Sequence, residues 1–144
     1  MAWNKAHKSQ TKDKILTCAA ALFTKNGFEQ VSIDQVMKHA ELTRGAFYAH
    51  FSSKSDLYAQ SVVKAATIAS NRHLGNCTAS IKSLTDAYLS QEHRDADDKT
   101  PCPLAFLVSD ISQQDELVRN TYTQIFKAFS DKALNYSKNE DTAL

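Results

Sequence analysis

The chain has 144 residues, of which 42% are hydrophobic and 23% are charged, so it is long enough to bury a core and too apolar to be globally disordered. No apolar run approaches the roughly 20 residues that span a bilayer, and residues 1–14 lack the apolar segment of a secretory signal. These features exclude membrane and secreted proteins, and we expect a cytoplasmic chain. Three glycines and two prolines leave few places to turn, which favours long helices.

The formal net charge is only +1, but the charges are unevenly distributed along the chain. Residues 1–64 hold nine lysines and arginines against five aspartates and glutamates, whereas residues 65–144 hold eight against eleven. A basic first half and an acidic second half suit a DNA-binding module joined to a regulatory one. The three cysteines are odd in number and far apart, which fits neither a disulfide framework nor a zinc site, and we expect no cofactor and no metal.

The first predicted helix covers residues 9–26. Ile15, Ala19 and Phe23 recur there at helical spacing. Gly27 follows directly, and it predicts a left-handed cap that ends the helix.

Two short helices come next. Ser32 and Gln35 form a capping box that predicts a helix over residues 33–40. After a tight turn, Thr43 is the predicted cap of a helix over residues 44–50. This pattern is typical of a helix-turn-helix that reads DNA with its second helix.

A fourth helix is predicted to start at Lys54 and to continue past Arg72. Ser53 and Asp56 form a second capping box at its beginning. We expect this helix to link the two halves of the chain.

The second half also reads as helical, since no alternating strand pattern occurs in it. The expected features are a break at residues 75–76, a helix over 77–91, a charged loop over 93–100, an apolar helix that follows Pro101 and Pro103 and reaches Ile111, a helix over 115–137, and a frayed end over 137–144. The chain is therefore predicted to be all-α, with an N-terminal three-helix helix-turn-helix domain followed by a helical regulatory domain.

The segment TKDKILTCAAALFTKNGFEQVSIDQVMKHAELTRGAFYAHFSSKSDLYAQSV strongly resembles the DNA-binding domain of the TetR family of transcriptional regulators. The resemblance covers roughly residues 9–62, and the aromatic run from Phe47 to Phe51 with Lys54 is its most specific part. One departure is Glu41, where the family usually has glycine. A left-handed backbone there would cost a residue other than glycine roughly 1 kcal/mol.

Residues 102–129 are loosely similar to the segment after the ligand-pocket loop of some family members. The resemblance implies a DNA-binding domain over residues 9–69 and a helical ligand-binding and dimerisation domain over residues 70–144. The chain is shorter than typical members, so we expect either a compact member or one without the helices of the dimer interface.

The resemblance also implies which residues contact DNA, namely Ser32, Thr43, Arg44, Gly45, Ala46, Tyr48, His50 and Lys54. Arg44 is suited to a guanine or a phosphate, and Tyr48 to a phosphate through its hydroxyl. Lys54 would join the free N–H groups at a helix start in holding a phosphate. Structural alternatives remain open: a solvated charge for Arg44 or Lys54, a surface histidine for His50, and a simple cap for Ser32.

In the second half, the aromatic residues Tyr88, Phe106, Tyr122 and Phe126 are candidates for a ligand pocket, with the core as the alternative. Cys102 lies at a predicted helix start, where the helix N-terminus would lower the pKa of the thiol. This makes a redox or electrophile sensor one hypothesis and a small buried residue the other.

The leading functional hypothesis is a ligand-responsive repressor that reads a palindromic operator in double-stranded DNA as a homodimer and responds to a small-molecule effector. The alternative is a truncated member without tight DNA binding, which acts as a partner or dominant-negative of a full-length relative. An enzyme is not expected, because the sequence contains no nucleophile–base motif and no phosphate loop.

Overall fold

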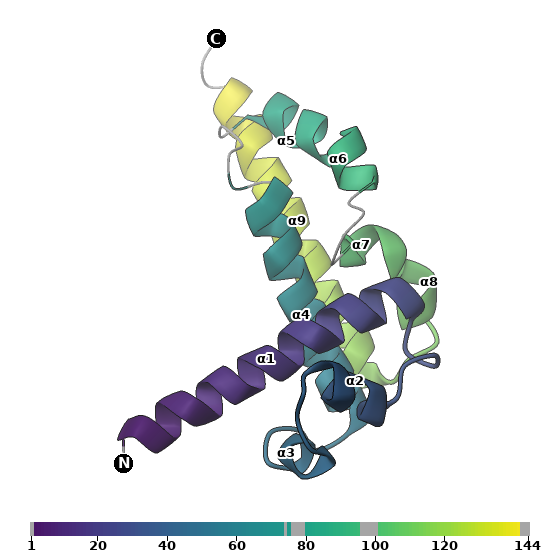
Figure 1. Cartoon of the computed structure of the whole chain (residues 1–144). Helices are drawn as coiled ribbons and strands as arrows, with labels where there is room; N and C mark the ends of the chain where they lie inside the picture. Colours follow the sequence, from purple (N-terminus) through teal and green to yellow (C-terminus); the bar gives the residue numbers. More distant parts are fainter. Residues whose placement is uncertain (1, 74, 76–79, 96–100, 142–144) are drawn as a thin grey trace.

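Helices and short turns make up the described part of the chain, which comprises residues 2–73, 75, 80–95 and 101–141 of a computed structural model. In chain order the helices are α1 (Ala2–Asn26), α2 (Ile33–His39), α3 (Arg44–Tyr48), α4 (Lys54–His73), α5 (Ile81–Tyr88), α6 (Gln91–Arg94), α7 (Pro103–Phe106), α8 (Val108–Ile111) and α9 (Glu116–Asp141) (Figure 1). The described residues contain no strand, so the all-α prediction is confirmed.

The first helix is longer than its apolar pattern predicted. α1 begins at Ala2 instead of residue 9. Residues 2–14 contain neither glycine nor proline and include two alanines and four lysines, which sustain a helix without an apolar face. The helix ends as predicted at Gly27, whose φ of +78° is left-handed and whose N–H donates to the Phe23 carbonyl at 2.7 Å.

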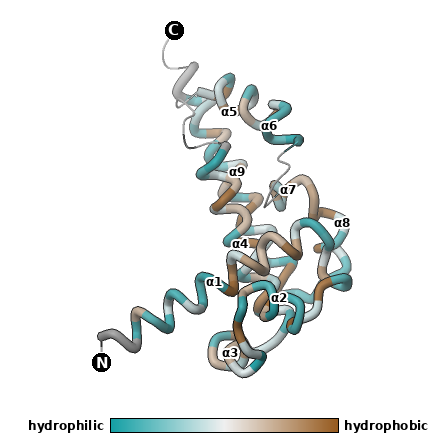
Figure 2. Tube along the Cα trace, in the orientation of Figure 1, coloured by the Kyte–Doolittle hydropathy of each residue, from teal (hydrophilic) through white to brown (hydrophobic). Residues whose placement is uncertain are grey.

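The core lies where α1 crosses α4 and where α4 runs along α9 (Figure 1). Ile15 and Phe23 of α1, Phe47 of α3 and Tyr58 of α4 are all buried there. Figure 2 shows hydrophobic segments gathered around this crossing, whereas the first turns of α1 are hydrophilic.

The same core continues into the second half of the chain. Leu107, Ile111 of α8 and Val118 of α9 belong to one cluster with the buried residues of α1, α3 and α4. The division into domains at residues 69 and 70 stays a prediction, and the packing shows that the two parts share apolar contacts.

α4 begins at Lys54 as predicted, but its capping differs by one residue. The Ser53 hydroxyl accepts the Asp56 N–H at 3.0 Å, as in a capping box. The Asp56 carboxylate, however, accepts the N–H of Ser52 at 3.0 Å and the hydroxyl of Ser52 at 3.2 Å instead of the Ser53 N–H. The predicted capping box is therefore incomplete, because the Asp56 carboxylate binds Ser52 instead of the Ser53 N–H.

Two predicted helices of the second half are each divided in the structure. Within the helix expected over 77–91, the structure has α5, which ends before Ser90. The Ser90 hydroxyl accepts the His93 N–H at 3.1 Å and so starts a new turn. This turn is α6, which occupies the beginning of the expected loop over 93–100. The apolar helix expected to reach Ile111 is interrupted at the buried residue Leu107, which separates α7 from α8.

The last helix extends further than predicted, because α9 continues to Asp141 instead of ending at residue 137. Residues 76–79, 96–100 and 142–144, on which parts of the predicted break, helix, loop and frayed end fall, lie outside the described residues. Within the described part, every helix is too short or too polar to cross a membrane.

Candidate nucleic-acid interface

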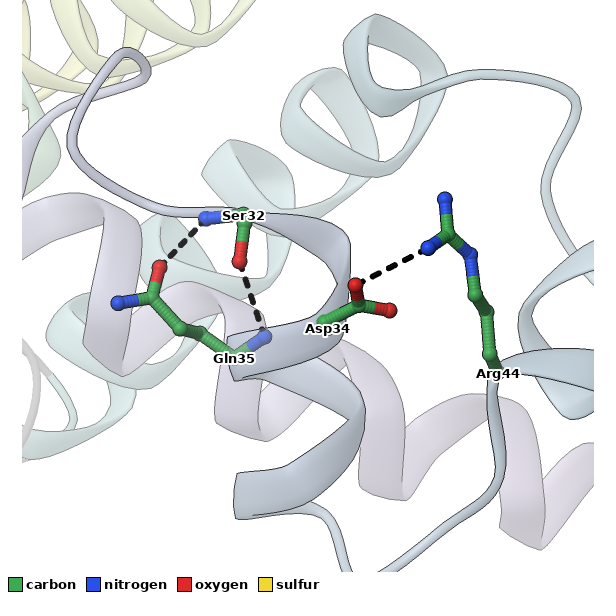
Figure 3. A network of polar contacts seen from close by, with 4 residues as sticks. All are labelled: Ser32, Asp34, Gln35 and Arg44. Carbon is green, nitrogen blue, oxygen red and sulfur yellow. Dashed lines mark hydrogen bonds and ion pairs between the residues drawn. The ribbon is translucent and has the colours of Figure 1, made fainter.

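The first element of the candidate interface is the start of α2. Ser32 and Gln35 form the predicted capping box: the Gln35 N–H donates to the Ser32 hydroxyl at 3.1 Å, and the Ser32 N–H donates to the Gln35 side chain at 2.7 Å (Figure 3). The box fixes the direction in which α2 begins. Ser32 is exposed, so its position suits a phosphate contact as well as a cap.

The turn between α2 and α3 has the left-handed residue that the sequence indicated. Glu41 has a φ of +55°. Its N–H donates to the Lys38 carbonyl at 3.0 Å, and the Leu42 N–H donates to the Met37 carbonyl at 2.9 Å, which together make a Schellman motif. The turn thus keeps the geometry normally provided by glycine, with a strained glutamate in its place.

Thr43 occupies the N-cap position of α3, but its side chain makes no capping hydrogen bond. The predicted side-chain cap is therefore wrong, although the position is right. Thr43 is exposed, which leaves the hydroxyl accessible beside the first N–H groups of α3.

Arg44 is held between α2 and α3. Its Nη1 lies 3.0 Å from Oδ2 of Asp34, as Figure 3 shows. A hydrogen bond to the Tyr48 hydroxyl and then the charge of Asp34 raise the pKa of Arg44, which is fully charged at any relevant pH. The guanidinium is thus positioned by both helices while it stays exposed.

Three further residues of α3 differ in how closely they pack against the rest of the protein. A Cβ added at Gly45 would meet only the Thr43 Oγ1, at 3.9 Å, so packing does not require glycine there. Ala46 is half-buried against the core. Tyr48 is 62% exposed, and its ring stands edge-on against the buried Phe47 ring at 5.1 Å between centroids.

His50 and Lys54 lie beside α3. His50 is half-buried, and desolvation, followed by the charges of Lys8 and Lys12, lowers its pKa, so the ring is neutral at pH 7. The Lys54 ammonium lies 4.1 Å from the centroid of the Phe28 ring, a cation–π contact. A phosphate contact by Lys54 would therefore compete with this contact.

The second half contains a cavity of about 380 Å³ between α4, α7 and α9. Among the predicted pocket residues, only Tyr88 lines it. The sequence did not single out other lining residues such as Val63, Ala66, His93 and Ile125. Helical spacing alone could not identify them, because the same apolar residues serve equally well as core.

The other three predicted pocket residues lie elsewhere. Phe106 and Phe126 are 51% and 54% exposed, and neither lines the cavity. Tyr122 is half-buried and donates its hydroxyl to the Leu104 carbonyl at 2.8 Å. Phe106, Tyr122 and Phe126 do not line this cavity, although Tyr122 bonds to its lining residue Leu104, and their role in ligand binding stays a prediction.

Cys102 lines the cavity and is buried at the start of α7. Burial raises the pKa of the thiol more than the N–H groups of Ala105 and Leu104 lower it. The predicted lowering of this pKa is therefore wrong, and the structure favours the alternative of a small buried residue over a reactive thiolate.

A polar contact joins α8 to the DNA-binding half. The Asp110 carboxylate accepts a hydrogen bond from the Tyr58 hydroxyl of α4 and lies 3.3 Å from the Phe28 N–H in the turn after α1. Tyr58 is fully buried, and burial together with the hydrogen bond to Asp110 raises its pKa, so it is a neutral donor. This contact connects three segments that the sequence gave no reason to bring together.

Comparison with known proteins identifies this helical arrangement. The sequence pattern of the family described as "Bacterial regulatory proteins, tetR family" matches residues 15–60. The solved structure of a TetR-family transcriptional regulator from Agrobacterium tumefaciens superposes with a TM-score of 0.70 at 26% identity, over 86% of this chain and 67% of that one.

Curated relatives agree with these matches. The Transposon Tn10 TetC protein of Escherichia coli is 33% identical over 95 residues, which are 60% of this chain and 48% of that protein. The transcriptional regulator AcrR of Shigella flexneri is 39% identical over 56 residues, 39% of this chain and 26% of AcrR. The negative transcriptional regulator IcaR of Staphylococcus aureus is 37% identical over 51 residues, 35% of this chain and 27% of IcaR. The chain thus spans half or less of the length of these relatives.

Proposed function

Because residues 15–60 form a DNA-binding domain of the TetR family, we propose that the chain binds double-stranded operator DNA and regulates transcription, as a repressor in the simplest case. The exposed surface of α3 is the observation that carries this proposal. It presents Tyr48 and the open backbone at Gly45, beside an arginine that two helices hold in place. A helix of this kind fits the major groove.

The proposed contacts divide into base reading and phosphate positioning. Arg44 pairs with a guanine edge or a phosphate, and the missing side chain of Gly45 allows the backbone to approach the groove closely. Ala46 lies on the same helix. Ser32, Thr43, Tyr48, His50 and Lys54 contact phosphates on either side and fix the register of the helix.

The proposed regulation uses the cavity in the second half. Its wall is largely apolar, so a mainly apolar small molecule is the effector class that fits best. α4 lines this cavity with Val63 and Ala66 and also carries Tyr58, which bonds to Asp110 of α8. A ligand that favours one position of α4 over another would thereby change DNA affinity by its differential affinity for the two states.

The proposed assembly is a homodimer that reads a palindromic operator, with one α3 for each half-site. The alternative from the sequence, a partner of a full-length relative without tight DNA binding of its own, stays a prediction. The same experiment separates the two functions.

The test is binding of duplex DNA from the promoter region of the protein's own gene, measured over a series of salt concentrations. We expect tight binding that weakens steeply with salt. Tyr48→Ala should weaken it by roughly 1–3 kcal/mol, because a side chain at the protein–DNA contact is lost. Tyr48 is exposed, so circular dichroism and thermal unfolding should change little.

A matched control is Leu89→Ala, which truncates the 74% exposed Leu89 in the other half of the chain. This variant should bind DNA like the unchanged protein. Weak binding that is indifferent to Tyr48→Ala would contradict the proposal and favour the partner role.

A further inference from the structure

The first turns of α1 extend away from the body of the molecule (Figure 1). Residues 5–10 are all exposed, and Figure 2 shows this part of the helix as hydrophilic. Burial in the core begins only at Ile15. Residues 5–10 are therefore not part of the apolar core, although the chain forms a regular helix there.

Three lysines share one face of this extension. Lys5, Lys8 and Lys12 are spaced at i, i+3 and i+7, which places them above one another on a helix with 3.6 residues per turn. The ridge that they form, here called the lysine ridge, is roughly 10 Å long at about 1.5 Å per residue. Like charges at this spacing repel one another, so the ridge does not stabilise the helix.

The other charges on this part of α1 are paired on other faces. Asp13 lies 2.7 Å from the ammonium of Lys64 in α4. Lys14 lies 3.5 Å from Glu41 in the turn before α3. Within the described parts of the chain, no ion pair joins a ridge lysine to a carboxylate, although the charges of Lys12 and Asp56 are close enough to interact.

The lysine ridge is continuous with the surface around α3. The Lys12 ammonium lies 5.5 Å from the centroid of the Phe51 ring, just after α3. Lys8 and Lys12 are also close enough to His50 for their charges to act on its ring. The ridge thus begins beside the candidate interface and leads outwards from it.

We propose that Lys5, Lys8 and Lys12 bind the DNA phosphate backbone outside the groove that α3 enters, and so extend the contact into the flanking DNA. This inference rests on the proposed DNA-binding function. A row of ammonium groups without ion pairs, on a helix next to the candidate interface, suits a polyanion, because each lysine that meets a phosphate releases condensed counterions. The contact is independent of base sequence.

The test compares the full chain with a variant that carries Lys5→Gln, Lys8→Gln and Lys12→Gln. Both are titrated with the same promoter duplex and with an unrelated duplex over a salt series. In the variant the slope of log K against log salt should become shallower by about 0.9 for each lost phosphate contact, up to about 3 for each bound protomer. Affinity for both duplexes should fall by a similar factor.

A control with the same loss of charge is Lys82→Gln, Lys127→Gln and Lys138→Gln, since these exposed lysines lie on α5 and α9. It should keep the slope of the unchanged protein. Hydroxyl-radical footprinting should show protection of flanking backbone that the ridge variant loses and the control keeps. Circular dichroism checks that α1 stays helical.

The outcomes separate this inference from the proposed function. If the ridge variant binds with an unchanged slope and footprint while Tyr48→Ala weakens binding as expected, the proposed role of the lysine ridge is overturned and the proposed function stands. An equal reduction of the salt slope in the control would also contradict the proposed role of the lysine ridge, because the change in net charge alone would then explain the result. If the unchanged protein binds neither duplex, the proposed function itself fails.

Discussion

At the scale of single residues, two positions beside the candidate interface have unusual properties. Glu41 adopts a left-handed backbone next to α3. His50 is kept neutral by burial and by two neighbouring lysines. Each makes a prediction that a single substitution tests.

Glu41→Gly should raise the free energy of unfolding by about 0.5–1 kcal/mol, because glycine adopts a positive φ without a Cβ clash. The ion pair lost with Lys14 is exposed and contributes little. Urea unfolding measures the difference. Glu41→Gln is the matched control, since it removes the charge and keeps the strain. Equal stabilities of the two variants would show that the turn stores no strain.

DNA affinity should rise as the pH falls from about 7.5 to about 6, at a fixed salt concentration, if His50 contacts phosphate. The free protein lowers the pKa of His50, whereas a phosphate raises it, so binding takes up a proton. The gain is at most about tenfold per pH unit for each histidine.

His50→Gln should remove this pH dependence, and His39→Gln, at the exposed end of α2, should retain it. The opposite result would assign the proton to His39. His50 also makes folding depend on pH, because its pKa is lower in the folded protein than in the unfolded chain. Its stabilising contribution is complete above about pH 6.5 and is lost as the pH falls through its lower folded pKa. Unfolding controls at each pH keep the two effects apart.

At the scale of elements, Asp110 is the contact through which α8 reaches both α4 and the turn after α1. Its partners, Tyr58 and Phe28, are 52 and 82 residues away in the sequence. A Cβ at Gly27 would lie 2.9 Å from the same carboxylate, so the left-handed glycine also makes room for it. A shift of α8 would therefore move the hydrogen-bond partner of both α4 and the turn after α1.

Tyr58→Phe should lower the free energy of unfolding by about 1.5–3 kcal/mol, because it removes a hydrogen bond to a charged group. Hydrogen exchange at the Phe28 N–H should become faster, since Asp110 loses its main anchor. Tyr122→Phe is the matched control: its hydroxyl bonds to the neutral Leu104 carbonyl, and about 0.5–1.5 kcal/mol should be lost. Equal losses would show that Asp110 makes no special contribution.

At the scale of the whole molecule, one apolar cluster joins the half that carries α2 and α3 to the rest. Phe47 behind the exposed face of α3 and Val118 on α9 belong to it. α4 contributes to this cluster and also to the wall of the cavity in the second half. In the proposed regulation, an effector in the cavity would act on α3 through α4 and this shared cluster.

The sequence by itself determined what depends on neighbouring residues. The capping box at Ser32, the left-handed cap at Gly27 and the start of α4 at Lys54 follow from backbone rules that act within a few residues. The left-handed position at Glu41 was implied by the family resemblance. The apolar pattern also identified the buried face of α3, where Phe47 is fully buried.

Only the tertiary structure decided which side chains meet across the chain. Helical spacing could not tell that Tyr88 lines the cavity while Phe126 faces outwards, or that Asp110 reaches Tyr58. Helical spacing also missed the first turns of α1, which carry the lysine ridge and bring Lys12 next to Phe51, just after α3. The physical reason is that periodicity reports that a residue is apolar, whereas its partner is set by how the helices pack.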